Sequence, residues 1–456
     1  MQSHGERGTS SAHVPIIVCA EHGSRDRMSA TFDVVVVGAG PGGIAAATVA
    51  AEAGLRVCLL DDNRTPGGQI WRGFRAETAK KNLHGEDFLH WTDRLSRSKC
   101  EVWCGWQVTD HPSPGFVRVE REAEFRDIVF RRLILATGAR ERFVPFPGWT
   151  LPGVTGLGGL QALVKAGLKP RDKRIVVAGS GPLLLAIAAN LADAGANILA
   201  IYEQAPLSKL IRFGFTLAVH PGKLIEGAGY RRKLGNVPYR TGCWVTCAEG
   251  SDRVERVFAT NGRKQWAQEC DWLACGFHLV PNLELPRLFG CRIVDGYVWV
   301  DPLGQSSVQN IACIGELTGI GGVDKALLEG RIAGFAAAGR ESEMRVLAPG
   351  LKRRQAFARR LDHAFAPRDE LRTLANPDTL VCRCEDVSYA ELRECDSWRQ
   401  AKLHARCGMG ACQGRICGTA TEFLFDWKYA GMRPPVFPAA VSAIAAKVDS
   451  PESVRH

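Results

Sequence analysis

The sequence predicts an α/β protein that is built on two nucleotide-binding units and ends in a small helical cysteine-bearing module. Two features predict this architecture: two copies of a strand, glycine turn, helix and strand pattern, and four closely paired cysteines near the C-terminus. The first copy spans residues 31–60 and the second spans residues 174–203. A chain of 456 residues with 46% hydrophobic residues is long enough to form two or three domains.

The first unit follows residues 1–30, which lack periodicity and are expected to be a disordered arm. An apolar strand over residues 32–37 leads into a glycine-rich turn, whose fingerprint residues are Gly38, Gly40, Pro41 and Gly43. Glycine lets the turn and the start of the helix approach a pyrophosphate group. Asp61 ends the next strand, where a carboxylate accepts hydrogen bonds from ribose hydroxyls. Together these features predict an adenine dinucleotide site.

The second unit repeats this pattern with one departure. It turns at Gly179 and Gly181 and carries Glu203 at the end of its second strand. Leu184 stands where a third glycine would allow the helix to approach the sheet. Glu203 suits an adenosine ribose that lacks a 2′-phosphate. The sequence leaves two interpretations open, an NAD site or a retained fold whose nucleotide site is empty or repurposed.

Two such units about 140 residues apart resemble the two-dinucleotide-binding-domain flavoproteins. Residues 133–138 resemble the segment through which that family leaves its flavin domain, residues 273–282 resemble its return crossing, and residues 311–322 resemble its second flavin motif. Glu316 replaces the aspartate of that motif, which keeps the charge and adds one methylene. Besides the first turn and Asp61, the resemblance implies these FAD-binding residues: Gly68, Gln69, Arg72, Thr137, Gly138, Gly315, Glu316, Gly321 and Gly322.

The charge pattern excludes some classes of function. The formal net charge is +10, and its densest run, from Lys352 to Arg360, alternates with apolar residues at helical spacing. This run indicates an amphipathic helix with a solvated basic face, so we expect no nucleic-acid binding. No apolar run approaches the roughly 18 residues of a membrane span. We therefore expect a cytoplasmic protein without a transmembrane segment, with any membrane association arising through a complex.

The paired cysteines near the C-terminus are candidate metal ligands. Cys382 and Cys384 form the first pair, and Cys412 and Cys417 form the second. Four thiolates are the minimum that either an iron–sulfur cluster or a structural zinc site needs. The spacing favours a [2Fe–2S] cluster, because zinc sites usually use C-x2-C pairs, but zinc or no metal remain open from spacing alone. The chain has no C-x2-C pair at all, which argues against a disulfide reductase.

Four segments together resemble a narrower family: GGQIWR, GSGPLLL, TGIGG and CRCED followed by CGMGACQGRIC. This family comprises the α subunits of bacterial heteromeric flavin dehydrogenases that oxidise C–N bonds, among them those of opine (octopine or nopaline) oxidase, D-hydroxyproline dehydrogenase and hydrogen cyanide synthase. The resemblance covers residues 31–440. It implies a [2Fe–2S] domain like bacterioferritin-associated ferredoxin, with Cys382, Cys384, Cys412 and Cys417 as ligands and Cys407 as an ambiguous neighbour.

The resemblance also implies how the chain is divided. Residues 31–145 and 277–340 would form the FAD-binding domain, and residues 146–276 would be an inserted NAD-like domain. Residues 341–375 would be a basic helical linker, residues 376–430 the [2Fe–2S] domain and residues 431–456 a C-terminal tail.

In that family the substrate is oxidised on a separate β subunit that resembles D-amino-acid oxidase. The resemblance implies that electrons cross an interfacial flavin, often FMN, reach the cluster and FAD of this chain, and leave to an external acceptor. We expect no catalytic acid or base on this chain. Two other hypotheses stay open, a stand-alone NADH:acceptor oxidoreductase and a redox-silent scaffold subunit.

Overall fold

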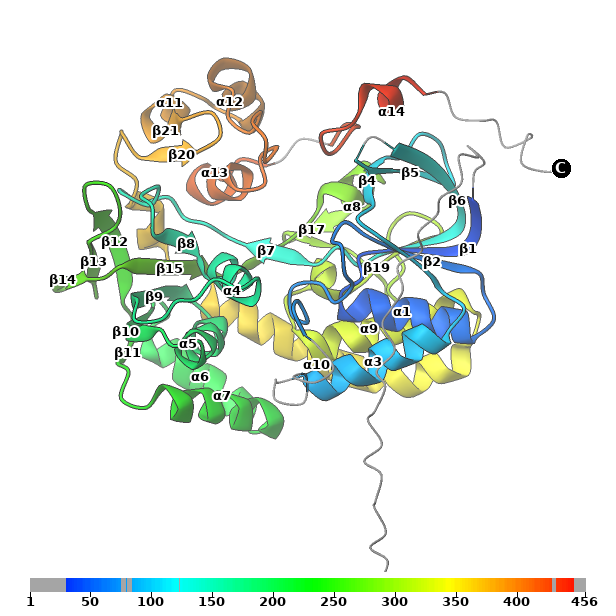
Figure 1. Cartoon of the computed structure of the whole chain (residues 1–456), viewed down its shortest axis with the longest axis horizontal. Helices are drawn as coiled ribbons and strands as arrows, with labels where there is room; N and C mark the ends of the chain where they lie inside the picture. Colours follow the sequence, from blue (N-terminus) through cyan, green and yellow to red (C-terminus); the bar gives the residue numbers. More distant parts are fainter. Residues whose placement is uncertain (1–29, 75–78, 80–83, 123, 429–431, 447–456) are drawn as a thin grey trace, which may run out of the picture.

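The computed structural model of the chain describes residues 30–74, 79, 84–122, 124–428 and 432–446. Two open sheets with their helices lie side by side, and a small cysteine-bearing unit lies against them (Figure 1). The prediction of an α/β fold with two nucleotide-binding units is confirmed. The expected disordered arm lies outside the described residues except for Ala30, which begins the first strand.

The first sheet has seven strands in the order β3-β2-β1-β6-β5-β4, with β19 pairing with β6. Its strands are β1 (Ala30–Val37), β2 (Val57–Asp61), β3 (Glu101–Cys104), β4 (Gln107–Asp110), β5 (Phe116–Arg121), β6 (Glu124–Leu135) and β19 (Ile311–Cys313). Its helices are α1 (Pro41–Glu52), α3 (Gly85–Arg97) and α9 (Val323–Ala337). Because β19 lies parallel to β6, the sheet joins two stretches of chain that are far apart in sequence.

The second sheet is parallel and has the order β11-β10-β9-β15-β8. Its strands are β8 (Val154–Gly156), β9 (Arg174–Ser180), β10 (Asn197–Glu203), β11 (Tyr239–Thr241) and β15 (Trp272–Phe277). Its helices are α4 (Leu157–Lys165), α5 (Leu183–Asp193), α6 (Leu207–Leu217) and α7 (Pro221–Leu234). An antiparallel sheet of β12 (Trp244–Glu249), β13 (Arg256–Thr260) and β14 (Gln265–Glu269) adjoins it.

Two antiparallel strands, β7 (Ala139–Glu141) and β16 (Leu279–Pro281), carry the chain between the two sheets. Short elements follow the return crossing: α8 (Glu284–Leu288), β17 (Ile293–Val294), β18 (Tyr297–Val298) and η1 (Gly315–Thr318). The expected basic linker begins with α10 (Glu341–Phe365), which contacts both α9 and α6 and so spans the two units. Both strands and α10 therefore hold the two nucleotide-binding units together.

The cysteine-bearing unit is small and has its own hydrophobic core around Val381, Leu392 and Trp398. It follows η2 (Asp369–Thr373) and contains β20 (Leu380–Cys382), β21 (Val387–Ser388), α11 (Tyr389–Arg393), α12 (Trp398–Ala405) and α13 (Cys417–Phe425). Ser388 and Glu391 form a capping box that starts α11. This unit is helical, as the sequence predicted.

The described part of the C-terminal tail returns to the first sheet, where it ends in α14 (Val441–Ala445). Val436 N–H donates to Thr109 O at 2.9 Å, and the buried Arg118 donates to the carbonyl oxygens of Ala443 and Ala446. The tail is thus fixed to the β4–β5 hairpin. Among the helices that the structure describes, none is long and apolar enough to cross a bilayer.

Candidate functional site

The first glycine turn presses the start of α1 against the end of β1. A Cβ atom on Gly43 would lie 1.8 Å from the carbonyl oxygen of Gly38, so only glycine fits there. A Cβ atom on Gly40, in contrast, would meet no heavy atom within 4 Å. No side chain caps α1, and Pro41 is its first residue. The open space at Gly40 and the uncapped N–H groups of α1 fit the pyrophosphate of a bound dinucleotide.

Asp61 is buried at the end of β2 and is tied to the turn. Its Oδ2 accepts a hydrogen bond from Ala39 N–H at 2.5 Å, and its Oδ1 accepts from the backbone N–H and the side-chain amide of Asn63, both at 2.8 Å. Burial raises the pKa of Asp61, and these hydrogen bonds oppose that rise. Arg72 joins the network by donating to Asn63 Oδ1 at 2.8 Å. Asn63 is a site residue that was not predicted from the sequence.

Two other predicted residues, Gly68 and Gln69, lie in the loop that follows β2. A Cβ atom on Gly68 would lie 2.9 Å from the Cα atom of Gly40, so this loop closes over the glycine turn. Lys165, at the end of α4, donates to the carbonyl oxygens of Gln69 and Ile70 at 3.3 and 3.1 Å. The loop therefore also contacts the second nucleotide-binding unit.

The second flavin motif forms the turn between β19 and α9. Glu316 accepts hydrogen bonds from the N–H groups of Gly321 at 3.0 Å and Gly322 at 2.9 Å. Its carboxylate thus fixes the two glycines that lead into α9. Burial raises the pKa of Glu316.

A buried ion pair beneath this turn was not predicted from the sequence. Lys325 and Glu329 are 1% and 5% exposed and lie one helical turn apart on α9. Lys325 Nζ donates to Gly315 O and Thr318 Oγ1, both at 2.7 Å, and Glu329 accepts from Gly315 N–H at 2.8 Å. The only sequence signal was the spacing of the lysine and the glutamate, four residues apart in a helix that also carries Asp324 and Arg331.

The predicted crossing residues Thr137 and Gly138 are paired with Asn282 on the return strand. Asn282 N–H donates to Gly138 O at 3.0 Å, and its side-chain amide donates to Thr137 O at 2.7 Å. Thr137 Oγ1 donates to Asn282 O at 3.1 Å. These bonds fix the two crossing strands where they leave the first unit.

In the second unit, the carboxylate of Glu203 at the end of β10 already accepts hydrogen bonds from the protein itself. Glu203 is fully buried and accepts hydrogen bonds from Gly181 N–H and Ala205 N–H, both at 2.8 Å. Burial raises its pKa to about 7. Leu184 is also fully buried, within the hydrophobic core under α5. Gly179 lies against Gly276 O, and a Cβ atom on Gly179 would lie 1.8 Å from that oxygen.

The linker after α10 covers the end of this second glycine turn. Ser180 Oγ donates to Phe365 O at 2.7 Å, and the Gln204 amide donates to Ala366 O at 3.1 Å. Arg368 N–H donates back to Gln204 Oε1 at 3.1 Å, and its guanidinium lies 3.8 Å from the ring centre of Trp244. The ends of β9 and β10, where a nucleotide would bind, are therefore in contact with the end of α10 and the segment that follows it.

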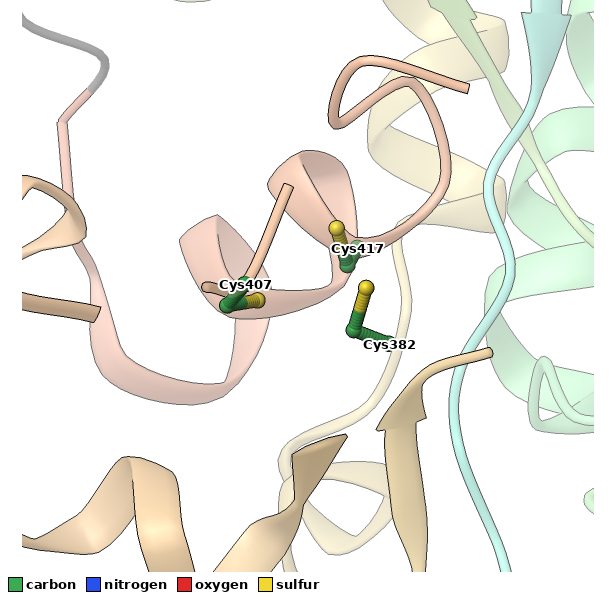
Figure 2. A group of neighbouring side chains, drawn as sticks. All are labelled: Cys382, Cys407 and Cys417. Atoms are coloured by element: carbon green, nitrogen blue, oxygen red, sulfur yellow. The ribbon is translucent and has the colours of Figure 1, made fainter. Parts of the chain in front are cut away.

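The structure brings five cysteines of the small unit together. The Sγ atoms of Cys382, Cys407 and Cys417 all lie within 4.8 Å of one another, and Figure 2 shows these thiols close together; they come from the end of β20, the loop after α12 and the start of α13. Cys412 contacts both Cys417 and Cys384. Hydrogen bonds from Cys407 and Cys417 lower the pKa of Cys382 to about 2, and one from Cys417 lowers that of Cys412 to about 5. The hydrogen bonds to Cys382 raise the pKa of Cys407 and of Cys417 in turn. Such a group of thiols could hold a cluster or a metal ion, which would take its ligands as thiolates.

Two hydrogen bonds attach the two cysteine-bearing segments to the crossing. Arg140 on β7 donates to Arg415 O at 3.0 Å, between Cys412 and Cys417. Trp149 donates its indole N–H to Leu380 O at 2.6 Å, two residues before Cys382. Arg140 also pairs with Glu284 at 2.9 Å, which fixes its guanidinium. The group of five cysteines is thus held against β7 through Arg140 and against the second unit through Trp149.

This fold and its glycine turns define a class of oxidoreductase. The chain belongs to the pyridine nucleotide-disulphide oxidoreductases, whose pattern matches residues 32–338.

Named relatives share nearly the whole chain. It is similar to the A subunit of opine oxidase from Rhizobium meliloti strain 1021, with 33% identity over 92% of this chain and 99% of the relative. It is also similar to the HcnB subunit of hydrogen cyanide synthase from Pseudomonas aeruginosa, with 30% identity over 84% of this chain and 90% of the relative. The resemblance to α subunits of this kind, predicted from the motifs, is confirmed.

Solved structures show the same fold. L-proline dehydrogenase from P. horikoshii superposes with a TM-score of 0.66 and 19% identity, covering 93% of this chain and 81% of the other. Thioredoxin reductase from T. acidophilum covers 70% of this chain and its own full length, with a TM-score of 0.54 and 19% identity.

Proposed function

We propose that the chain is the electron-transfer subunit of a heteromeric flavin-dependent dehydrogenase that oxidises a C–N bond. The substrate would be an opine, D-hydroxyproline, glycine or a related amine, and its oxidation would occur on a β subunit that resembles D-amino-acid oxidase, with FMN at the interface. The names of the relatives, which are subunits of opine oxidase and of hydrogen cyanide synthase, support a multi-subunit enzyme.

One observation carries this proposal: the group of five cysteines lies beside β7, the strand that leaves the first unit. Arg140 on β7 donates a hydrogen bond to the loop between Cys412 and Cys417. FAD at the first turn would supply two-electron chemistry, and a [2Fe–2S] cluster would carry electrons one at a time to an external acceptor. In this arrangement the protein binds the pyrophosphate at Gly40 and α1 and keeps both centres in fixed positions.

We propose Cys382, Cys384, Cys412 and Cys417 as the cluster ligands. Cys407 is the competing candidate, because its Sγ lies within 4.8 Å of those of Cys382 and Cys417. The spacing of the cysteines and their mutual contacts support four ligands drawn from this group of five.

Co-expression with a D-amino-acid-oxidase-like β subunit tests the proposal. We expect a stable complex that contains an additional flavin and reduces an artificial dye with an opine, D-hydroxyproline or glycine. Neither of the two chains should do so on its own. Turnover of such an amine by the purified chain without a β subunit would refute the division of labour.

A further inference from the structure

The helices α6 and α7 carry an unusual concentration of exposed apolar side chains. Six of the nineteen large hydrophobic side chains that are exposed in the described residues lie within residues 207–225: Leu207, Ile211, Phe215, Val219, Leu224 and Ile225. Their exposed fractions range from 54% to 77%. We call this group the α6–α7 tip. Apolar side chains that cluster on a surface mark a site of contact with another molecule or a membrane.

Leu207, Ile211 and Phe215 form a stripe along α6, because residues four apart lie on the same side of a helix. This stripe is separate from the side that faces the protein, where Phe213 is buried with Phe365 and Leu361. The helix therefore has two apolar sides, one packed on the protein and one exposed. Packing within the chain accounts only for the first.

The surroundings of the α6–α7 tip carry more basic than acidic side chains. Residues 207–234 contain six lysines and arginines and one glutamate; of the six, Lys223 is paired with Glu226 and Asp324, and Lys233 with Asp193. His220, at the junction of the two helices, packs against Phe357 of α10 at 4.7 Å between ring centres. Burial lowers the pKa of His220, and the positive charges of Arg353 and Arg354 lower it further. Arginines of α10 thus extend the basic surface next to the tip.

We propose that the α6–α7 tip docks the protein on an anionic lipid membrane. Exposed aliphatic and aromatic side chains flanked by lysine and arginine are the pattern of helices that lie in a membrane interface. A protein partner fits less well, because lysine is depleted in the cores of protein interfaces. The two helices lie at the lower left of Figure 1, at the opposite end from α11 and α12 of the cysteine-bearing unit. Docking would leave that unit directed away from the lipid.

Vesicle flotation of the full flavin-loaded chain tests this inference. We expect binding to phosphatidylcholine vesicles that contain phosphatidylglycerol, little binding to phosphatidylcholine alone, and release by salt. Phe215→Glu should lower the vesicle-bound fraction about tenfold, since it places a charge in the apolar stripe. Lys209→Glu should lower binding roughly fivefold or more through lost attraction to the lipid charge.

Leu403→Glu is the matched control, because Leu403 is 68% exposed on α12 at the other end of the molecule. It should bind vesicles as the unaltered chain does, and the flavin content of all variants should be equal. Absence of binding by the unaltered chain, or equal losses in Phe215→Glu and Leu403→Glu, overturns the inference. If Phe215→Glu instead releases the β subunit while vesicles never bind, the tip is a protein interface. Dye reduction without vesicles tests the proposed function separately.

Discussion

Replacing the buried Lys325 with methionine tests how the second flavin motif is supported. Methionine fills most of the volume but removes the ammonium, which bonds to Gly315 O, Thr318 Oγ1 and Glu329. Glu329, only 5% exposed, keeps its carboxylate but loses its counter-charge. Removing one partner of a buried pair costs about 3–5 kcal/mol, because the remaining charge stays buried without compensation.

A loss of that size is a large part of the roughly 5–15 kcal/mol that stabilises a domain. We therefore expect Lys325→Met to lower the urea midpoint of the first unit and to release flavin at lower urea, since the Gly315 turn loosens with it. Flavin fluorescence reports release, and circular dichroism reports unfolding. Lys352→Met is the control, because Lys352 is exposed on α10 and its loss should change stability by less than about 0.5 kcal/mol.

The double variant Lys325→Met/Glu329→Gln separates charge from packing. Once both charges are gone, nothing ionised stays buried, and the double variant should recover on the order of 1–3 kcal/mol relative to Lys325→Met. The reasoning is refuted if Lys325→Met is as stable as Lys352→Met, or if the two substitutions simply add.

Other predictions concern the cofactors and the second unit. Asp61→Ala should weaken flavin binding by roughly 1.5–3 kcal/mol, because the Ala39 and Asn63 N–H groups lose the carboxylate that accepts their hydrogen bonds and fixes the turn. Fluorescence titration with flavin measures the affinity, and an unchanged affinity would contradict this prediction. Cys412→Ser should abolish the cluster and Cys407→Ser should keep it, as iron and acid-labile sulfide analysis and EPR would show; the reverse result would change the ligand set, and stoichiometric zinc without sulfide would exclude the cluster. Anaerobic mixing with NADH should leave the flavin oxidised, whereas fast bleaching would favour the stand-alone reductase. The pKa of Glu203 is raised to about 7 in the folded chain against 4.5 in the unfolded chain, so the stability that its protonated form contributes is present at pH 4.5 and is lost as the pH rises through 7. The thermal midpoint of the unaltered chain should therefore fall more between pH 5 and 8 than that of Glu203→Gln. Parallel pH profiles of the two proteins would contradict this.

Features that depend on local sequence could be predicted. Apolar periodicity and the spacing of the glycines predicted both nucleotide-binding units. The structure explains the spacing, because a Cβ atom at Gly43 would clash with the carbonyl oxygen of Gly38. The two crossing segments were also recognisable in the sequence, whereas their pairing through β7 and β16 is a finding of the structure. The cysteine motif likewise placed five thiols in one small unit.

Contacts between distant segments could not be predicted. Nothing in the sequence near Ser180 or Gln204 indicates that Phe365 and Ala366 lie against them, because that depends on where a 25-residue helix ends in space. The Lys325 ion pair could not be predicted for a related reason. Its burial depends on the packing of α9 under the Gly315 turn, which the local sequence does not indicate.

For the proposed electron-transfer role, the attachment of the cysteine-bearing unit would set the speed of transfer. Electron tunnelling rates fall exponentially with distance, so even a small lasting outward displacement of one centre would slow transfer markedly. Arg140 and Trp149 hold the two cysteine segments separately, and Phe423 of α13 is buried in the hydrophobic core of the second unit. These attachments fix the unit, so the rate would depend on fixed geometry rather than on the fraction of time that a mobile carrier spends nearby.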